Sequence, residues 1–193
     1  MSLPKFNPRT AVLLLMIISV ATLRVIFNFD RTISPLSNFS PLGAMALFAG
    51  AYFNKKWKAY AFPLATLFLS DVFLSLTVFK EYSSTLNYNI WFWVYGSFIF
   101  ITMAGRWRIK KVTITSVTTA SLLCVLIHWI VSDIGVWLYL NTYPSTAEGY
   151  VACLVAAIPY ELKFLAGTII YSAILFGSFE WMQHKLKWQT VST

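Results

Sequence analysis

Long apolar runs, separated by short polar segments, are the feature of this sequence that most constrains its fold. Of the 193 residues, 58% are hydrophobic and only 11% are charged, whereas soluble domains have about 45–50% apolar and about 25% charged residues. A soluble domain of this size has too much surface for its volume to bury that many apolar side chains. The composition therefore argues against a soluble globular enzyme and predicts an integral membrane protein.

Six of the apolar runs are close to the ~20 residues that a helix needs to cross the bilayer core. They are residues 11–27, 38–53, 58–79, 89–103, 114–140 and 150–179. We therefore predict an all-α integral membrane protein, in which residues 1–193 form a single domain and a compact bundle of six transmembrane helices. The first run also has features of a signal peptide, but its apolar character continues to Phe27, which favours a retained helix.

Lysine and arginine are unevenly distributed over the segments that connect these runs. If the runs alternate in direction, one side of the membrane receives Lys5, Arg9, Lys55, Lys56, Lys58, Arg106, Arg108, Lys110, Lys111, Lys185 and Lys187. The other side receives Arg24, Arg31 and Lys80, and Lys163 lies within the last run. Basic residues gather in cytoplasmic loops, so both termini are expected in the cytoplasm. Because the bases form short clusters instead of one basic face, the net charge of +8 does not indicate nucleic-acid binding.

Polar side chains within the predicted helices lie mostly toward the extracytoplasmic side, at a rise of ~1.5 Å per residue. The residues concerned are Arg24, Asn38, Asp71, His128, Asp133 and Glu161. Ionisable groups are costly in lipid, so they should face a shared interior or a water-filled cavity. We expect this set to line or gate an outward-facing substrate pocket, with Arg24 as the counter-charge.

The alternative is that these groups only hold helices together, for instance through a pair between Arg24 and Asp71 or Glu161. Such interhelical polar contacts contribute about 0.6 kcal/mol on average. The protein would then be a structural or assembly subunit of a larger membrane complex. The pocket is favoured because the polar groups avoid the cytoplasmic half. His128 and Asp133 are five residues apart, about 140° around a helix, so they do not form a dyad on one helix face.

Two local sequence features allow more than one interpretation of how the helices are built and packed. Pro159 suits the first turn of a helix, which would make residues 150–158 a re-entrant segment, but it is equally compatible with a kink in one long helix. Ala46 and Gly50 form a small-x-x-x-small pair that allows close helix packing, and we expect that contact to lie within the chain.

Motifs of known membrane enzymes and nucleotide-binding proteins are absent from the sequence, including H-E-x-x-H, G-x-S-x-G and a Walker-type loop. The two cysteines, Cys124 and Cys153, have no C-x-x-C spacing. We therefore expect no enzymatic activity, no cofactor and no metal site. The expected partners are the lipid bilayer and a small-molecule solute.

Residues 38–53, with the sequence NFSPLGAMALFAGAYF, resemble the opening signature of a family of uncharacterised bacterial membrane proteins. The strings LSD at 69–71, GVW at 135–137, YP at 143–144 and AAIP at 156–159 look like further signatures of that family. The family is in turn similar to the substrate-binding S-components of energy-coupling-factor vitamin transporters, including solitary cobalamin carriers. Those proteins are six-helix bundles that bind a vitamin near the outer face.

The resemblance implies a carrier or binding subunit for a vitamin-sized solute in a bacterial cytoplasmic (inner) membrane. An energising module or another membrane subunit would be its partner. Three departures limit what can be carried over. The first helix lacks the A-x-x-x-A spacing used for docking, the family often has Asn where this chain has Asp133, and no cysteine lies near Asp71 to bind cobalt.

Overall fold

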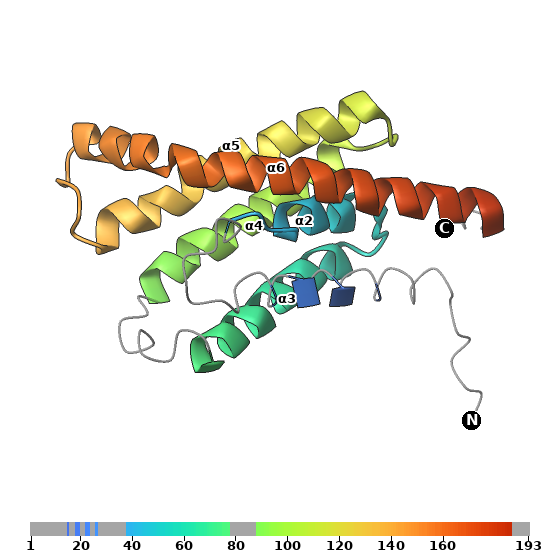
Figure 1. Ribbon diagram of the computed structural model, residues 1–193, viewed down its shortest axis with the longest axis horizontal. Helices are drawn as coiled ribbons and strands as arrows, with labels where there is room; N and C mark the ends of the chain where they lie inside the picture. The colour runs from blue at the N-terminus through green and yellow to red at the C-terminus, as the bar shows by residue number, and fades with distance from the viewer. Residues whose placement is uncertain are drawn as a thin grey trace.

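The computed structural model describes residues 38–77 and 88–186, together with residues 15, 18, 19, 22, 23 and 26 (Figure 1). Their regular secondary structure is entirely α-helical, as predicted. The helices are α2 (Leu42–Tyr52), α3 (Lys56–Thr77), α4 (Tyr88–Arg108), α5 (Ile114–Tyr139) and α6 (Ala147–Leu186). Most of the predicted first span, residues 11–27, lies outside the described residues.

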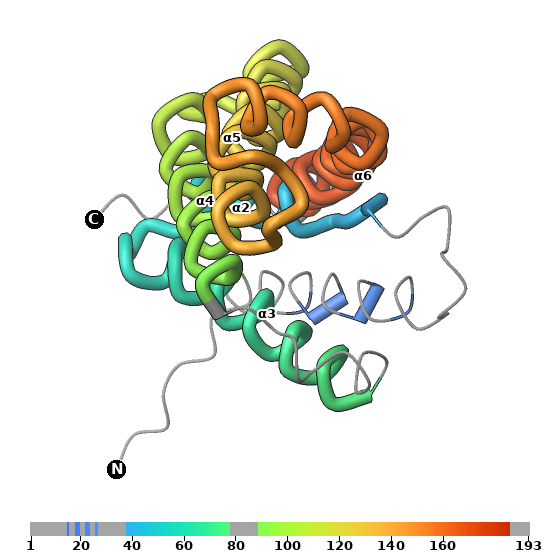
Figure 2. The backbone as a smooth tube through the Cα atoms, turned by 90° about the vertical axis from the view of Figure 1, so that its left-hand side faces the viewer, coloured from blue at the N-terminus to red at the C-terminus, as the bar shows by residue number. Residues whose placement is uncertain are grey.

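Helix α2 is the shortest of the five and lies at the centre of the bundle. All of its residues except Ala51 are buried, and it contacts α3, α4, α5 and α6. Figure 2 shows it among α4, α5 and α6, with α3 to one side. Its 11 residues extend over about 16 Å, roughly half of a ~30 Å bilayer core. The run 38–53 therefore forms a shorter helix than predicted, since residues 38–41 are not helical.

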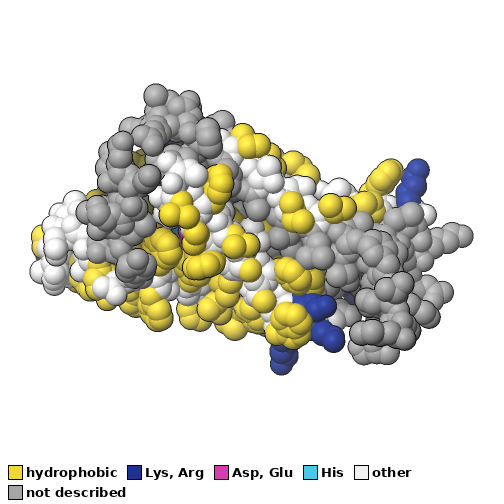
Figure 3. Space-filling view, turned by 90° about the horizontal axis from the view of Figure 1, so that it is seen from below, with side chains coloured by type: hydrophobic (Ala, Val, Ile, Leu, Met, Phe, Trp, Pro, Cys, Tyr) yellow, Lys and Arg dark blue, Asp and Glu magenta, His cyan; other side chains and the backbone are white. Residues whose placement is uncertain are grey.

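Of the helices that the structure describes, three are long and apolar enough to cross a membrane, namely α3, α5 and α6. Large apolar side chains are exposed on them, including Leu76 (68% exposed), Ile114 (89%) and Leu162 (60%). Hydrophobic side chains cover much of the described surface in Figure 3, and the visible lysine and arginine side chains lie in its right-hand half, toward the end where α6 finishes. Exposed apolar surface of this extent is typical of a helical membrane protein.

The crossing of α2 and α4 brings their backbones into direct contact at two glycines. A Cβ atom at Gly50 would lie 2.2 Å from the carbonyl oxygen of Thr102 and 2.9 Å from the backbone nitrogen of Arg106. A Cβ atom at Gly105 would lie 2.6 Å from the carbonyl oxygen of Leu47. The small residue at position 50 thus serves packing within the chain, as the sequence predicted.

Arg106 joins the end of α2 to the end of α4. Its Nη1 donates to the carbonyl oxygen of Phe53 at 3.0 Å, and its Nη2 donates to that of Asn54 at 3.3 Å. The last carbonyl groups of a helix lack intrahelical donors and carry a partial negative charge. The guanidinium therefore satisfies and neutralises the C-terminal end of α2.

Helices α5 and α6 form an antiparallel hairpin that positions the candidate site. Helix α5 starts with a capping box, because Ser116 N donates to Thr113 Oγ1 at 3.1 Å and Thr113 N donates to Ser116 Oγ at 3.0 Å. At the other end, Tyr150 Oη donates to the carbonyl oxygen of Ile130 at 2.6 Å. This contact fixes the register between the two helices.

Pro159 lies inside α6, which continues through it as one helix of 40 residues. Figure 1 draws it as one uninterrupted ribbon. The structure thus has the long helix and not the re-entrant segment over 150–158. A proline removes one helical hydrogen bond and disturbs the preceding turn. The carbonyl left without its helical donor is that of Val155, and the adjacent carbonyl oxygen of Leu154 accepts a hydrogen bond from Trp129 Nε1 at 3.0 Å. Helix α5 therefore contacts α6 beside the position where the helix is weakened.

Candidate functional site

A polar cavity of about 470 Å³ lies between α5 and α6, near the loop that connects them. Its volume is within the range of roughly 300–1,000 Å³ that small-molecule pockets occupy. Its wall also includes residues from the segment before α2 and from α4. The lining residues are Asn38, Val94, His128, Ser132, Asp133, Val136, Tyr143, Cys153, Ala156, Ala157, Tyr160 and Glu161.

His128 and Glu161 form the central polar contact of this cavity. His128 Nδ1 lies 2.8 Å from Glu161 Oε1, and the two side chains are 22% and 10% exposed. The imidazole lies beside two aromatic rings, with its centroid 4.5 Å from that of Phe164 and 5.9 Å from that of Phe98. An apolar surrounding of this kind strengthens a charge-assisted hydrogen bond.

Two carboxylate oxygens in the cavity wall have no hydrogen-bond partner in the described part of the chain. They are Asp133 Oδ2 and Glu161 Oε2, and both atoms are buried. A buried acceptor without a donor costs about 1–3 kcal/mol, and more if it is charged. Such atoms in a native protein need an explanation, for example a ligand that donates to them.

The packing of the helix pair explains why these side chains meet. Ser132 is one turn after His128 on α5, and its hydroxyl donates to the carbonyl oxygen of His128 at 2.6 Å. Asp133 does not bond to His128, in line with their spacing, but the cavity is wide enough for both to line it. Cys153 lies opposite them on α6, with its Sγ 3.9 Å from the carbonyl oxygen of Asp133.

Four of the six predicted site residues therefore line one cavity, namely Asn38, His128, Asp133 and Glu161. Asp71 lies elsewhere, at the contact between α3 and α4, where Oδ2 accepts a hydrogen bond from Tyr95 Oη at 2.9 Å. Arg24 is outside the described residues. The prediction missed the aromatic residues of the wall, Tyr143 and Tyr160. The YP string at 143–144 was the signal that pointed to the first of them.

The position of Asp71 leads to a prediction about stability. The substitution Asp71→Asn should lower thermal stability in detergent by about 1 kcal/mol, because it replaces a charge-assisted hydrogen bond by a neutral one. Tyr95→Phe removes the same bond and should give a similar loss, measured by thermal denaturation. Neither substitution should change the accessibility of Cys153 to thiol reagents. An altered accessibility in Asp71→Asn alone would assign Asp71 to the pocket.

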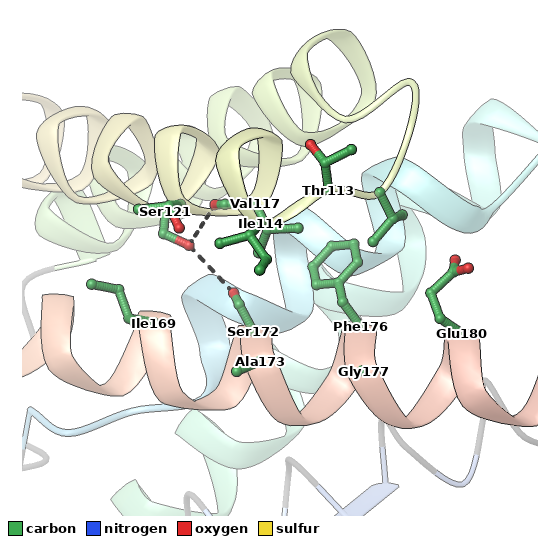
Figure 4. A pocket seen from close by; sticks show the side chains of 12 residues that line it. Thr113, Ile114, Val117, Ser121, Ile169, Ser172, Ala173, Phe176, Gly177 and Glu180 are labelled. Carbon is green, nitrogen blue, oxygen red and sulfur yellow. Dashed lines mark hydrogen bonds between the residues drawn. The ribbon is translucent and has the colours of Figure 1, made fainter.

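A second cavity, of about 540 Å³, lies at the other end of the α5–α6 pair. Figure 4 shows Ser121 and Ser172 facing each other across it, with Glu180 at one end. The two serine hydroxyls are 3.5 Å apart, and the Glu180 carboxylate accepts a hydrogen bond from the hydroxyl of Tyr52. Most of the remaining wall is apolar. Because its ionisable group already has a protein donor, this cavity is a weaker candidate for a polar ligand.

No group of three or more His, Cys, Asp and Glu side chains is arranged to hold a metal ion in the described part of the chain. A family model described as a family of unknown function (DUF6580) matches residues 4–190. No curated protein and no solved structure matches the chain. These comparisons provide no link to the S-components that the sequence resembles.

Proposed function

We propose that this chain, which belongs to the DUF6580 family of unknown function, is a membrane carrier or binding subunit for a small solute. The solute is held in the polar cavity between α5 and α6. One observation carries the proposal: Asp133 and Glu161 line a cavity of about 470 Å³ and have buried oxygens without a donor in the described part of the chain. An interhelical contact accounts for Glu161 Oε1, which pairs with His128 Nδ1, but not for the two oxygens without a donor.

The distribution of basic residues supports an outward-facing cavity. All described lysines and arginines except Lys163 lie in the segments 53–58 and 106–111 or near the end of α6. The Arg106 contact with Phe53 and the Tyr52 contact with Glu180 bring these segments to one end of the bundle. By the positive-inside rule that end is cytoplasmic. The cavity, near Tyr143 in the opposite loop, then opens outward.

The full topology that we propose has six membrane segments, with both termini in the cytoplasm. In this topology, helix α2 crosses only the cytoplasmic half of the bilayer. Residues 38–41 complete the crossing as non-helical chain. Irregular backbone is tolerated at membrane depth where it is enclosed by protein or lines a cavity. Asn38 lines the cavity, and Gly167 of α6 packs against the backbone of Ser40. The proposed location is the bacterial cytoplasmic membrane.

Cys153 offers a direct test, because it lines the cavity. In the Cys124→Ser background, a membrane-impermeant methanethiosulfonate reagent added to the outside of intact cells should modify Cys153. The matched control is Cys153→Ser, which leaves Cys124 as the single cysteine. Cys124 is fully buried and does not line the cavity, so it should stay unmodified. Mass spectrometry of the purified protein gives the readout.

Two results would contradict the proposal. Modification of Cys153 only after the cells are permeabilised would place the cavity on the cytoplasmic side. Cys153 is only 3% exposed, so the same labelling is repeated on Ala157→Cys, at a partly exposed position of the cavity wall, in a variant lacking both native cysteines. No modification at either position in either condition would show a cavity closed to water. The alternative from the sequence, a structural subunit of a larger membrane complex, would then replace the carrier.

A further inference from the structure

We propose that the solute held in this cavity is a small organic cation, bound by Asp133 and Glu161 with Tyr143 and Tyr160 as aromatic walls. This inference rests on the proposed function and adds the substrate class. It also excludes solutes whose main polar group is a phosphate or a carboxylate.

The charges of the cavity wall give the first argument. Within the described residues, the wall contains two carboxylic acids and one histidine, and no lysine or arginine. His128 is bonded to Glu161 Oε1, so it can offset one carboxylate at most. The other carboxylate has no basic partner among the wall residues that the structure describes. A carboxylate withdrawn from water needs a counter-ion or donors, and a bound cation supplies both.

The two oxygens without donors give the second argument. Asp133 Oδ2 and Glu161 Oε2 belong to residues that are each only 8% exposed. An ammonium group has up to three donors and a guanidinium group has five, and neither has an acceptor. A group of either kind would pair with these oxygens without leaving a polar atom of its own unsatisfied. An anionic solute would instead add acceptors to a wall that already has too many.

The aromatic rings of the wall give the third argument. Tyr143 and Tyr160 line the same cavity as the two acids. An aromatic face attracts a cation within about 6 Å of its centroid. Tyr160 already makes one such contact, because Lys163 Nζ lies over its ring at 6.0 Å from the centroid. The other face of that ring and the ring of Tyr143 are suited to an ammonium-bearing solute.

The test uses Cys153 as a reporter and two impermeant methanethiosulfonates that carry opposite permanent charges. One bears a trimethylammonium group and the other a sulfonate group. Their rates of modification are measured on intact cells in the Cys124→Ser background, and the cation-to-anion rate ratio is calculated. The reference is Ser145→Cys in a variant lacking both native cysteines, since Ser145 is exposed in the loop between α5 and α6. Comparing the ratio at Cys153 with the ratio at position 145 corrects for the intrinsic difference in reactivity between the two reagents.

The ratio at Cys153 should exceed the ratio at position 145 by on the order of tenfold or more, because a cleft of one charge sign raises the local concentration of counter-ions. Asp133→Asn combined with Glu161→Gln should reduce it to the reference value. Glu148→Gln, which neutralises an exposed acid at the start of α6, should leave it unchanged.

Equal ratios at positions 153 and 145 would overturn the cation proposal and leave the carrier proposal standing. That outcome would indicate that the two acids are protonated or that water supplies their donors. A preference for the sulfonate reagent would also overturn it. If neither reagent modifies Cys153 or the Ala157→Cys variant, whose cysteine replaces a partly exposed wall residue, the cavity is closed to solvent, and both proposals fail together.

Discussion

Replacing Gly50 with alanine should destabilise the protein by several kcal/mol, and replacing it with leucine should abolish folding. A Cβ atom at position 50 would lie 2.2 Å from the carbonyl oxygen of Thr102, and this neighbour belongs to the α4 backbone, which cannot move without displacing the helix. Overpacking a tight contact costs about 1–3 kcal/mol and sometimes more. The measurement is thermal denaturation in detergent, together with the yield of monodisperse protein. Gly105→Ala should behave similarly, since its Cβ would meet the backbone of Leu47 at 2.6 Å.

Two other helical glycines provide matched controls for this prediction. A Cβ atom at Gly96 or Gly177 would meet no atom within 4 Å. Alanine is favoured over glycine by about 1 kcal/mol within a helix, so Gly96→Ala and Gly177→Ala should be neutral or stabilising. If Gly50→Ala were as stable as these controls, the close crossing of α2 and α4 would be wrong.

The substitution His128→Leu should cost about 3–5 kcal/mol if Glu161 is ionised. The leucine fills the space between Phe98 and Phe164, but it removes the partner that lies 2.8 Å from Glu161 Oε1, so both oxygens of this buried carboxylate are then without a donor. Removing one member of a buried ion pair typically costs this much, because the remaining charge is uncompensated. Unfolding in mixed detergent micelles, followed by circular dichroism, measures the loss.

The double variant His128→Leu with Glu161→Leu provides the control, because it removes the carboxylate as well. It should recover most of the stability, since replacing a buried ion pair by apolar residues is often neutral or better. A loss near 0.6 kcal/mol in the single variant, which is the average for an interhelical hydrogen bond in membranes, would contradict an ionic pair and identify a neutral one.

For α3, α4, α5 and α6, most of the helix ends predicted from the sequence lie within a few residues of the observed ends. The runs 58–79 and 114–140 correspond to α3 and α5. Helix α5 begins where the predicted run begins, because Thr113 caps it there. The sequence did not predict that α2 is enclosed by protein. Lipid and protein interior both select apolar side chains, so composition does not distinguish a helix that faces lipid from one that faces other helices. Only the small residues, such as Ala46 and Gly50, indicated close packing.

The candidate site could likewise be predicted only in part from the sequence. Depth in the membrane follows from counting residues, and it placed His128, Asp133 and Glu161 at one level. Which groups meet also depends on how each helix is rotated about its axis. Asp71 is turned toward Tyr95 and not toward the cavity, and one sequence carries no signal for that rotation. The pairing of His128 with Glu161 depends on the register of α5 and α6, which contacts such as that of Tyr150 with Ile130 establish.

The enclosed position of α2 has a consequence for how the protein is made. The helix is synthesised early, whereas three of the helices that surround it, α4, α5 and α6, follow later in the chain. At about 5–20 residues per second, the ribosome needs on the order of ten seconds to complete α6. Until then lipid has to solvate the surface that α2 later buries against these helices. Its sequence, LGAMALFAGAY, suits that interval, because it contains no charged side chain and only the terminal tyrosine has a polar group. Biogenesis as well as final packing therefore favours a central helix that is apolar on every side.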